Sequence, residues 1–389
     1  MIKNELLIVG VLLLIETVVL LLAKNEKTRG LFRFLPAVFW IYFIPMLFST
    51  FGFLDPQSPV YSTITKNLLP AALVLLLLSV DVRSIAGLGK KALGMMLAGS
   101  VGIMVGIPLV FYVFRDWVGR DYWAGFGALS GSWIGGSSNL VAVKEAIGAP
   151  ENVFLPMIVV DTIVPYVWMG GLVALAGFQG VFDRWIKADN SSLEALHQNR
   201  LQQSAVKVQF SFLNGCFIIL IALVASFAAQ QLAGRLPQIK DVISSSAWTI
   251  ILVSTLGLGL SFSPLRHLES RGSTDIGYIL LYFVLTSIGA KASLASMGNA
   301  GLLIVAGFCV VLIHLGMLLL AAHFLKAPLF LVAVSSQANI GGAASAPIVA
   351  EIYKPGLAYV GLLMAIFGNI IGTYLGIITS QICRWVSSL

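Results

Sequence analysis

The chain has 389 residues, of which 58% are hydrophobic and only 11% are charged, and its mean hydropathy is +0.94. A soluble domain carries about 25% charged residues, so this chain lacks the polar residues that cover a soluble surface. The composition excludes an intrinsically disordered protein, a disulfide scaffold and a nucleic-acid-binding protein. The net charge of +7 comes from basic residues in short loops between apolar runs, where such charge sets membrane orientation.

Twelve apolar segments are expected to enter the membrane, since a bilayer core takes ~20 apolar residues per helix. In chain order they cover residues 5–24, 35–54, 65–82, 92–114, 122–147, 152–178, 209–233, 245–262, 275–290, 300–324, 328–351 and 356–382. The first is expected to be a retained helix with its N-terminus outside, because a basic cluster follows it and no cleavage site does. The polar stretch 181–208 is expected to be a cytoplasmic linker between two halves.

The two halves resemble each other. LSGSWIGG at 129–136 matches SSQANIGG at 335–342 at an offset of 206, and Asp161 matches Asn369 at an offset of 208. We therefore predict an internal repeat, although two glycine-rich apolar stretches could also look alike by composition alone. Repeats in membrane transporters commonly frame a central substrate site.

Each copy carries a Gly-Gly pair that should interrupt its helix, because one glycine in a helix interior costs ~1 kcal/mol. The four glycines are Gly135, Gly136, Gly341 and Gly342. Irregular backbone survives at membrane depth only where it lines protein or a cavity, so we expect two hairpins with exposed backbone groups. A tight contact between small residues of neighbouring helices is the alternative.

The distribution of positive charge favours hairpins that enter the membrane and return. With both Gly-Gly segments re-entrant, ten helices span, and 15 of the 24 lysines and arginines lie inside. With both segments crossing, the same residues divide equally, which the positive-inside rule disfavours. Five spanning helices per copy is an odd number, so the second copy must be inverted. The fold expected is an all-α polytopic membrane protein with two inverted repeats, 1–180 and 209–389.

Polar side chains at the two hairpin tips are the predicted substrate site. Hydroxyl and amide groups there supply directional hydrogen bonds, and the helix starts carry partial positive charge that favours an anion. The predicted residues are Ser132, Ser137, Ser138, Asn139, Ser336, Gln337, Asn339 and Ser345.

Asp161 lies near the middle of segment 152–178, and a carboxylate at membrane depth marks a functional site by default. It suits Na⁺ binding or H⁺ coupling equally well, and a neutral structural aspartate is the alternative. The predicted cation-coupling residues are Asp161, Thr162, Asn369 and Thr373.

The remaining ionisable residues carry weaker signals. Arg83 and Lys291 are repeat mates that could attract an anion, although extension to the lipid headgroups is the simpler interpretation. No role is assigned to Glu16 inside the first helix. The four histidines show no metal-binding spacing, and the chain has neither a complete phosphate loop nor a GxSxG motif, so neither a metal site nor an enzyme is expected.

With these residues in view, the whole chain resembles the YjcL-like family of bacterial membrane proteins, whose domain is called domain of unknown function 819. The resemblance rests on WIGGSSN at 133–139 followed by Asp161, and on QANIGG at 337–342 followed by Asn369. The paired hairpins are also similar to those of sodium-coupled glutamate and 2-hydroxycarboxylate carriers. The chain departs from those carriers in length and in the residues after Gly-Gly, so their substrate class does not carry over.

The carrier resemblance implies a scaffold that dimerises and a transport part that moves like an elevator. The scaffold would be 1–64 and 209–274, and the transport part 65–180 and 275–389. We expect a secondary transporter, in the plasma (inner) membrane with both termini outside, that moves a small polar, anionic organic solute by symport with Na⁺ or H⁺. Its partners would be the solute, the bilayer and a second copy, with no cofactor and no nucleic acid. A channel or a non-transporting membrane scaffold is the alternative.

Overall fold

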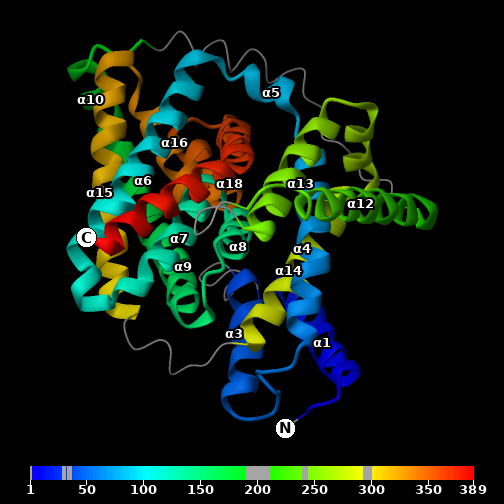
Figure 1. Ribbon diagram of the computed structural model, residues 1–389. Helices are drawn as coiled ribbons and strands as arrows, with labels where there is room; N and C mark the ends of the chain where they lie inside the picture. Colours follow the sequence, from blue (N-terminus) through cyan, green and yellow to red (C-terminus); the bar gives the residue numbers. More distant parts are fainter. Residues whose placement is uncertain (1, 29–31, 33–36, 190–210, 239–243, 292–299) are drawn as a thin grey trace. The chain divides into compact units, whose positions relative to one another are not determined.

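The fold is described from a computed structural model, which describes residues 2–28, 32, 37–189, 211–238, 244–291 and 300–389 (Figure 1). Over these residues the chain is 86% helical and forms no β-strand. The predicted all-α class is therefore confirmed. Most of the expected linker 181–208 lies outside the described residues, since the description stops at Asp189 and resumes at Ser211.

Most neighbouring helices within the described stretches are joined by short connections. The α-helices are α1 (Glu5–Lys24), α3 (Ala37–Thr50), α4 (Val60–Leu78), α5 (Val82–Ala86), α6 (Gly89–Val118), α7 (Trp123–Gly135), α8 (Ser137–Ile147), α9 (Glu151–Leu175), α10 (Gln179–Trp185), α12 (Phe212–Ala233), α13 (Ser245–Ser261), α14 (Ser273–Ala290), α15 (Ala300–Leu325), α16 (Leu329–Ile340), α17 (Gly342–Tyr353) and α18 (Ala358–Ser388). The described residues also form three 3₁₀ segments: η1 (Arg120–Tyr122), η2 (Ala176–Phe178) and η4 (Pro264–Arg271).

Eight helices of the described chain are long and apolar enough to cross a membrane, and a ninth span arises if α13 and η4, bent by 94° at their junction, count as one. This differs from the ten spans expected from the sequence. The segment expected at 35–54 forms the 14-residue helix α3, which at 1.5 Å per residue is shorter than the ~30 Å hydrocarbon core. The protein is nevertheless a multi-pass membrane protein.

Each Gly-Gly segment separates two short helices. In the first, α7 and α8 have 13 and 11 residues; in the second, α16 and α17 have 12 each. None of the four is long enough to cross a bilayer alone. The second glycine of each pair has a positive φ, +83° at Gly136 and +62° at Gly342, a backbone conformation that glycine adopts without steric cost. Gly136 lies between α7 and α8, whereas Gly341 lies between α16 and α17 and Gly342 begins α17.

The chain packs into two compact units, each built from separate stretches of sequence. Unit 1 comprises Met1–Ser79, Glu145–Thr162 and Val208–Leu303, and unit 2 comprises Val80–Lys144, Ile163–Lys207 and Ile304–Leu389. Both halves of the sequence contribute to both units. The expected division into scaffold and transport parts stays a prediction.

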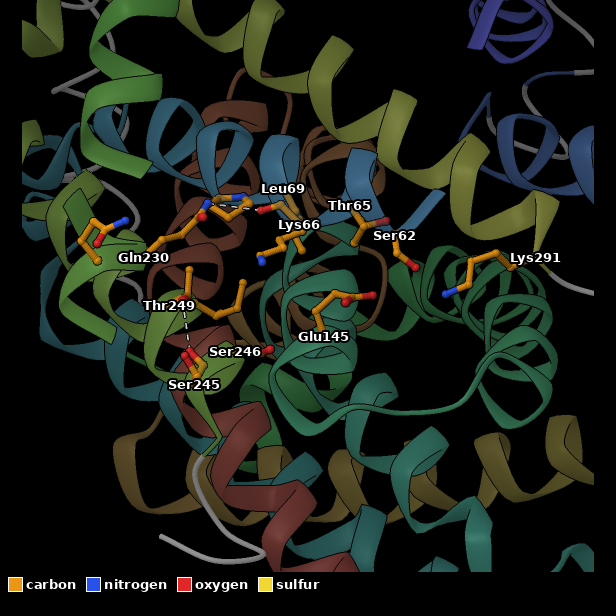
Figure 2. Close-up of a pocket in the computed structure, with 13 residues that line it drawn as sticks. Ser62, Thr65, Lys66, Leu69, Glu145, Gln230, Ser245, Ser246, Thr249 and Lys291 are labelled. Carbon is orange, nitrogen blue, oxygen red and sulfur yellow. Dashed lines mark hydrogen bonds between the residues drawn. The ribbon is translucent and has the colours of Figure 1, made fainter. Parts of the chain in front are cut away.

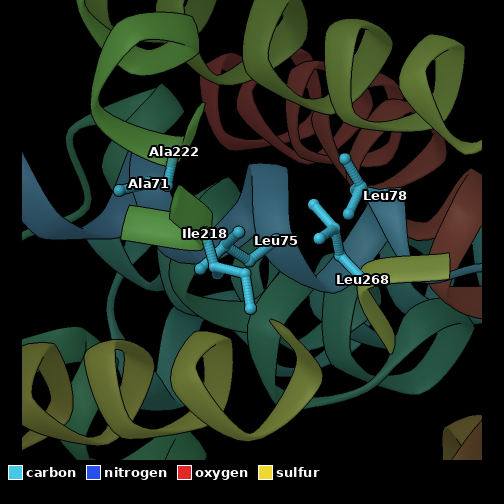
Figure 3. Close-up of a cluster of buried hydrophobic side chains, with 6 residues drawn as sticks. All are labelled: Ala71, Leu75, Leu78, Ile218, Ala222 and Leu268. Carbon is cyan, nitrogen blue, oxygen red and sulfur yellow. The ribbon is translucent and has the colours of Figure 1, made fainter. Parts of the chain in front are cut away.

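Unit 1 is organised around α4. Small and aliphatic side chains of α4, Ala71, Leu75 and Leu78, form a buried cluster with Ile218 and Ala222 of α12 and Leu268 of η4 (Figure 3). Glycine lets α13 approach α4 closely, because a Cβ at Gly257 of α13 would lie 2.9 Å from the Val74 carbonyl oxygen. Close helix contact through small residues is how membrane helices associate where lipid offers little hydrophobic driving force.

Unit 2 is organised around α18, which contacts α6, α7, α16 and α17 (Figure 1). Its glycines Gly368, Gly372 and Gly376 face α7, and a Cβ at Gly372 would lie 2.7 Å from the Cα of Gly135. A guanidinium holds the far end of α18, because Arg115 Nη1 donates to the Val386 carbonyl oxygen at 2.5 Å. This tight seam fixes the first hairpin against α18.

Candidate functional site

Unit 2 contains both Gly-Gly breaks. The first arms of the two hairpins, α7 and α16, contact each other, and α18 contacts both. Every substrate residue predicted from the sequence lies in this unit, on α7, α8, α16 or α17. The structure therefore brings the two predicted hairpin tips into one packing unit.

The first break is closed by Asn139, which is 2% exposed. Its Nδ2 donates to the carbonyl oxygens of Gly135, at 2.6 Å, and Asn369, at 3.3 Å, while its Oδ1 accepts from the Thr373 hydroxyl. Both ends of the amide are thus engaged. The side chain ties the start of α8 to the end of α7 and to α18.

The glycines of the first break are held by close packing. A Cβ at Gly135 would collide with Asn139 Nδ2 and lie 2.6 Å from the Gly368 carbonyl oxygen, and one at Gly136 would lie 3.2 Å from Asn369 Oδ1. The small-residue contact that the sequence offered as an alternative to a broken helix is therefore present together with the break. Substitution at Gly135 would push α18 away.

The second break is closed in a corresponding way by Gln337, which is fully buried. Its Nε2 donates to Ser345 Oγ at 2.7 Å and to the Pro165 carbonyl oxygen at 3.3 Å, and a Cβ at Gly341 would collide with both Gln337 Nε2 and Ser345 Oγ. Ser345 lies 206 residues after Asn139, the offset of the sequence repeat. Unlike Asn139, Gln337 keeps a buried oxygen, Oε1, with no hydrogen-bond partner among the described residues.

Asn339 leaves a second buried oxygen unsatisfied. Its Nδ2 donates to Ser100 Oγ at 3.1 Å, and Ser100 Oγ in turn donates to the Met96 carbonyl oxygen at 3.0 Å. Its Oδ1 is buried and has no hydrogen-bond partner in the described part of the chain. A Cβ on Gly99 would collide with that oxygen, and it would lie 2.9 Å from His314 Cε1. Glycine at position 99 makes room for both groups.

His314 of α15 is fully buried and completes this network. Its Nδ1 lies 2.8 Å from the Gly99 carbonyl oxygen and its Nε2 lies 3.1 Å from Ser336 Oγ, which also accepts from Trp168 Nε1 at 2.8 Å. A carbonyl oxygen can only accept, so Nδ1 carries a hydrogen. In the neutral ring Nε2 then accepts from the Ser336 hydroxyl. A chain of hydrogen bonds thus links α9, α16, α15 and α6.

The other predicted substrate residues lie close to the first break. Ser132 is buried on α7, and Ser137 and Ser138 are half-buried at the start of α8. The hydroxyls of Ser137 and Ser138 make no hydrogen bond with any residue that the structure describes. Both hydroxyls therefore remain able to bind a solute.

The predicted cation-coupling residues divide between the units. Asp161 and Thr162 belong to unit 1, and Asn369 and Thr373 to unit 2. Asp161 is half-buried and has an interaction partner of its own. Thr162 Oγ1 donates to the Ile158 carbonyl oxygen at 2.8 Å, and Thr373 bonds to Asn139. Both threonine hydroxyls therefore already make hydrogen bonds within the protein.

Sequence analysis missed His314, Gly99, Ser100 and Trp168. One signal was available: an ionisable side chain within an apolar membrane segment marks a functional site by default, and the rule that singled out Asp161 applies equally to His314. The three partners carried no signal of their own, because a small residue or a tryptophan in a membrane helix is commonplace. Within the described ranges, no group of three or more His, Cys, Asp or Glu side chains is placed to hold a metal ion.

Comparison with known proteins agrees with this architecture. The chain is 26% identical over 364 residues to a protein of Bacillus subtilis (strain 168) named uncharacterized membrane protein YjcL, and the match covers 88% of each chain. Residues 10–386 match a family described as "Protein of unknown function (DUF819)". Because that match covers nearly the whole sequence, the chain belongs to the DUF819 family of membrane proteins.

Proposed function

We propose that this protein is a secondary active transporter that moves a small polar, anionic organic solute together with Na⁺ or H⁺. Two short broken helices packed against one long helix support the proposal, because discontinuous helices commonly form the substrate and ion sites of carriers. The proposal includes re-entrant, inverted hairpins, an elevator-like motion, a homodimer and a plasma-membrane location with both termini outside.

The observation that carries the proposal is the pair of unsatisfied oxygens on α16. Gln337 Oε1 and Asn339 Oδ1 are buried without hydrogen-bond partners among the described residues, and a buried polar group left unpaired costs ~1–3 kcal/mol. A bound cation, or a solute that donates hydrogen bonds, would recover that free energy. The anionic part of a solute would instead be favoured by unpaired N–H groups at the starts of α8 and α17.

Two groups compete for the role of coupling site. Asp161 would bind Na⁺ or carry a proton, as a carboxylate at membrane depth can. His314 offers H⁺ coupling through its hydrogen bonds to Gly99 and Ser336, since an imidazole can take up and release a proton. Asp161→Asn should abolish Na⁺- or pH-dependent stabilisation if Asp161 is the coupling site, and His314→Gln should abolish pH dependence if His314 is.

The proposal is tested first by ligand-dependent thermal unfolding of the purified protein. Organic anions would be screened in Na⁺ and in K⁺ media, at pH 5.5 and pH 8. We expect a solute that raises the unfolding temperature only with Na⁺ or only at low pH. That solute should then accumulate in proteoliposomes against its own gradient when the matching ion gradient is imposed.

A channel or a non-transporting membrane scaffold gives different results in the same preparations. A channel would show steady ionic conductance in planar bilayers, because it needs a continuous polar path. A scaffold would neither conduct nor accumulate a stabilising solute. The polar side chains described above gather at two helix breaks and the helices that contact them, which favours an enclosed site. Either alternative result would replace the transporter proposal.

A further inference from the structure

Unit 1 contains an open cavity of about 460 Å³, and none of its lining residues belongs to the predicted substrate site (Figure 2). Its walls come from the start of α4, the end of α12 and the first turns of α13, together with Glu145 and Lys291. All of these residues belong to unit 1. Ligand pockets for small molecules have volumes of ~300–1,000 Å³, so this cavity is large enough for a small metabolite.

The lining of this cavity is polar in a chain that is otherwise apolar. Ten of its 13 lining residues are charged, hydroxyl or amide residues, the exceptions being Leu69, Pro70 and Ile250, whereas only 11% of the whole chain is charged. Polar groups cost free energy near a membrane unless they are satisfied. Their concentration at one cavity therefore indicates a site for a polar ligand rather than for a lipid tail.

Among the described residues that line the cavity, one positively charged side chain has no ion-pair partner. Lys291 Nζ lies 3.0 Å from Glu151 Oε1, and Glu145, the one carboxylate among the lining residues, has an interaction partner of its own. Lys66 is exposed and forms no ion pair with a residue that the structure describes. Among the described residues around the cavity, the unpaired charge is therefore positive and belongs to Lys66.

The neutral groups beside Lys66 add hydrogen-bond donors. Ser245 and Ser246 begin α13, and their hydroxyls make no hydrogen bond with any described residue. Thr249 is different, because its hydroxyl donates to the Ser245 carbonyl oxygen at 3.0 Å. Figure 2 shows these side chains on one wall of the cavity, on a helix separate from that of Lys66. An ammonium group opposite free hydroxyl donors is suited to an oxyanion.

We propose that this cavity binds the oxyanion group, carboxylate or phosphate, of a small polar molecule, with Lys66 as its ion-pair partner and Ser245 and Ser246 as hydrogen-bond donors. None of its lining residues belongs to the predicted substrate site, although Glu145 lies near the end of α8, which begins at the first break. It does not depend on the transport proposal, because its residues, charges and volume lie within unit 1 alone. The oxyanion comes either from a soluble molecule or from the headgroup of an anionic lipid.

Chemical protection of Lys66 tests the proposal at the site itself. The full-length protein in phosphatidylcholine nanodiscs would be acetylated with an amine-reactive reagent, with and without succinate or inorganic phosphate, and each lysine followed by mass spectrometry. At a probe concentration ten times its Kd, labelling of Lys66 should slow about tenfold. Lys24 is the matched control, since it is an exposed lysine of unit 1 that does not line the cavity.

A second set of nanodiscs with phosphatidylglycerol identifies the source of the oxyanion. Protection there without added anion would assign the site to a lipid headgroup, and protection only by succinate or phosphate would assign it to a soluble molecule. Lys66→Gln should weaken probe binding by at least tenfold, and Ser245→Ala with Ser246→Ala should weaken it severalfold.

Three results would overturn the proposal: no protection of Lys66 under any of these conditions, equal protection of Lys24, or unchanged probe affinity in Lys66→Gln. The variant Asn339→Ala separates this site from the transport site. It should leave the protection of Lys66 intact even if it removes solute transport, and loss of protection in that variant would place the bound anion in unit 2.

Discussion

The two Gly-Gly breaks of unit 2 are alike in the backbone φ of their second glycine and differ in the hydrogen bonding of the amide side chains beside them. At both breaks the second glycine has a positive φ, and an amide side chain spans the interruption. At the first break Asn139 uses both ends of its amide. At the second, Gln337 and Asn339 each retain a buried oxygen without a partner among the described residues.

The difference predicts that the first break contributes mainly to folding and the second mainly to ligand binding. A fully satisfied amide stabilises the position of the first hairpin against α18, so its removal should damage folding. An unsatisfied amide oxygen destabilises the ligand-free protein, and a ligand that bonds to it would restore this free energy. Its removal should therefore damage binding more than folding. Stability and ligand response should therefore separate between the two hairpins, in the following order of expected effect.

The largest effect is expected at the seam between α18 and α7. Gly372→Leu would force a side chain into the backbone of α7, because even a Cβ on Gly372 would lie 2.7 Å from the Cα of Gly135. Overpacking of this kind typically costs ~1–3 kcal/mol and occasionally more. We expect little monodisperse protein by size-exclusion chromatography. Gly170→Leu is the control, because a Cβ at Gly170 meets nothing within 4 Å. Normal yield of the Gly372 variant would contradict the tight seam.

The next comparison is between Asn139→Ala and Asn339→Ala. The first leaves the Thr373 hydroxyl and two carbonyl oxygens without their partner, so we expect about 2–3 kcal/mol of destabilisation. The second loses one hydrogen bond, to Ser100, and should cost about 1 kcal/mol. Thermal unfolding in detergent measures both. Equal destabilisation would remove the distinction between the hairpins.

A smaller difference is expected at the second glycines. Gly136→Ala and Gly342→Ala each place a side chain at positive φ, which costs ~1–2 kcal/mol. Gly136→Ala should be the more damaging, because its Cβ would lie 3.2 Å from Asn369 Oδ1 while that of Gly342 meets nothing within 4 Å. The measurement is the same unfolding experiment, and a larger loss in the Gly342 variant would reverse the predicted order.

The smallest effect on stability is expected for Gln337→Leu. This change removes two hydrogen bonds, to Ser345 and the Pro165 carbonyl oxygen, together with one unsatisfied buried oxygen. These contributions oppose each other, so the net change should be below about 1 kcal/mol. The stabilisation produced by a transported solute should nevertheless disappear. A variant that keeps the full solute response would exclude Gln337 Oε1 from the site.

Much of the fold was predictable because its signals are local. Long apolar runs predict membrane helices, and the Gly-Gly pairs at 135–136 and 341–342 predicted the two interruptions that the structure shows. The count of spans was less accurate, since α3 has only 14 residues. The length of an apolar run does not reveal where a helix ends within it, because the residues that follow the helix can also be apolar.

The site was predictable only in part. The pattern around Gly-Gly placed Gln337 and Asn339 among the candidates, but it treated Asn139 as their equal. The partners that distinguish them are Thr373, 234 residues from Asn139, and Ser100, 239 residues from Asn339. Single-sequence patterns carry no information on contacts at such separations. His314 was missed for another reason, since the rule that singled out Asp161 was not applied to it.

By itself the sequence determined a multi-pass helical membrane protein of the DUF819 family with two matched helix breaks, because composition, apolar length and glycine position act within a few residues. Only the tertiary structure decided that both halves contribute to both units, that the amide of Asn139 is fully bonded while those of Gln337 and Asn339 are not, and that Lys66 faces a polar cavity. Those outcomes depend on which helices pack together, and packing is set by the complementarity of surfaces far apart in the chain.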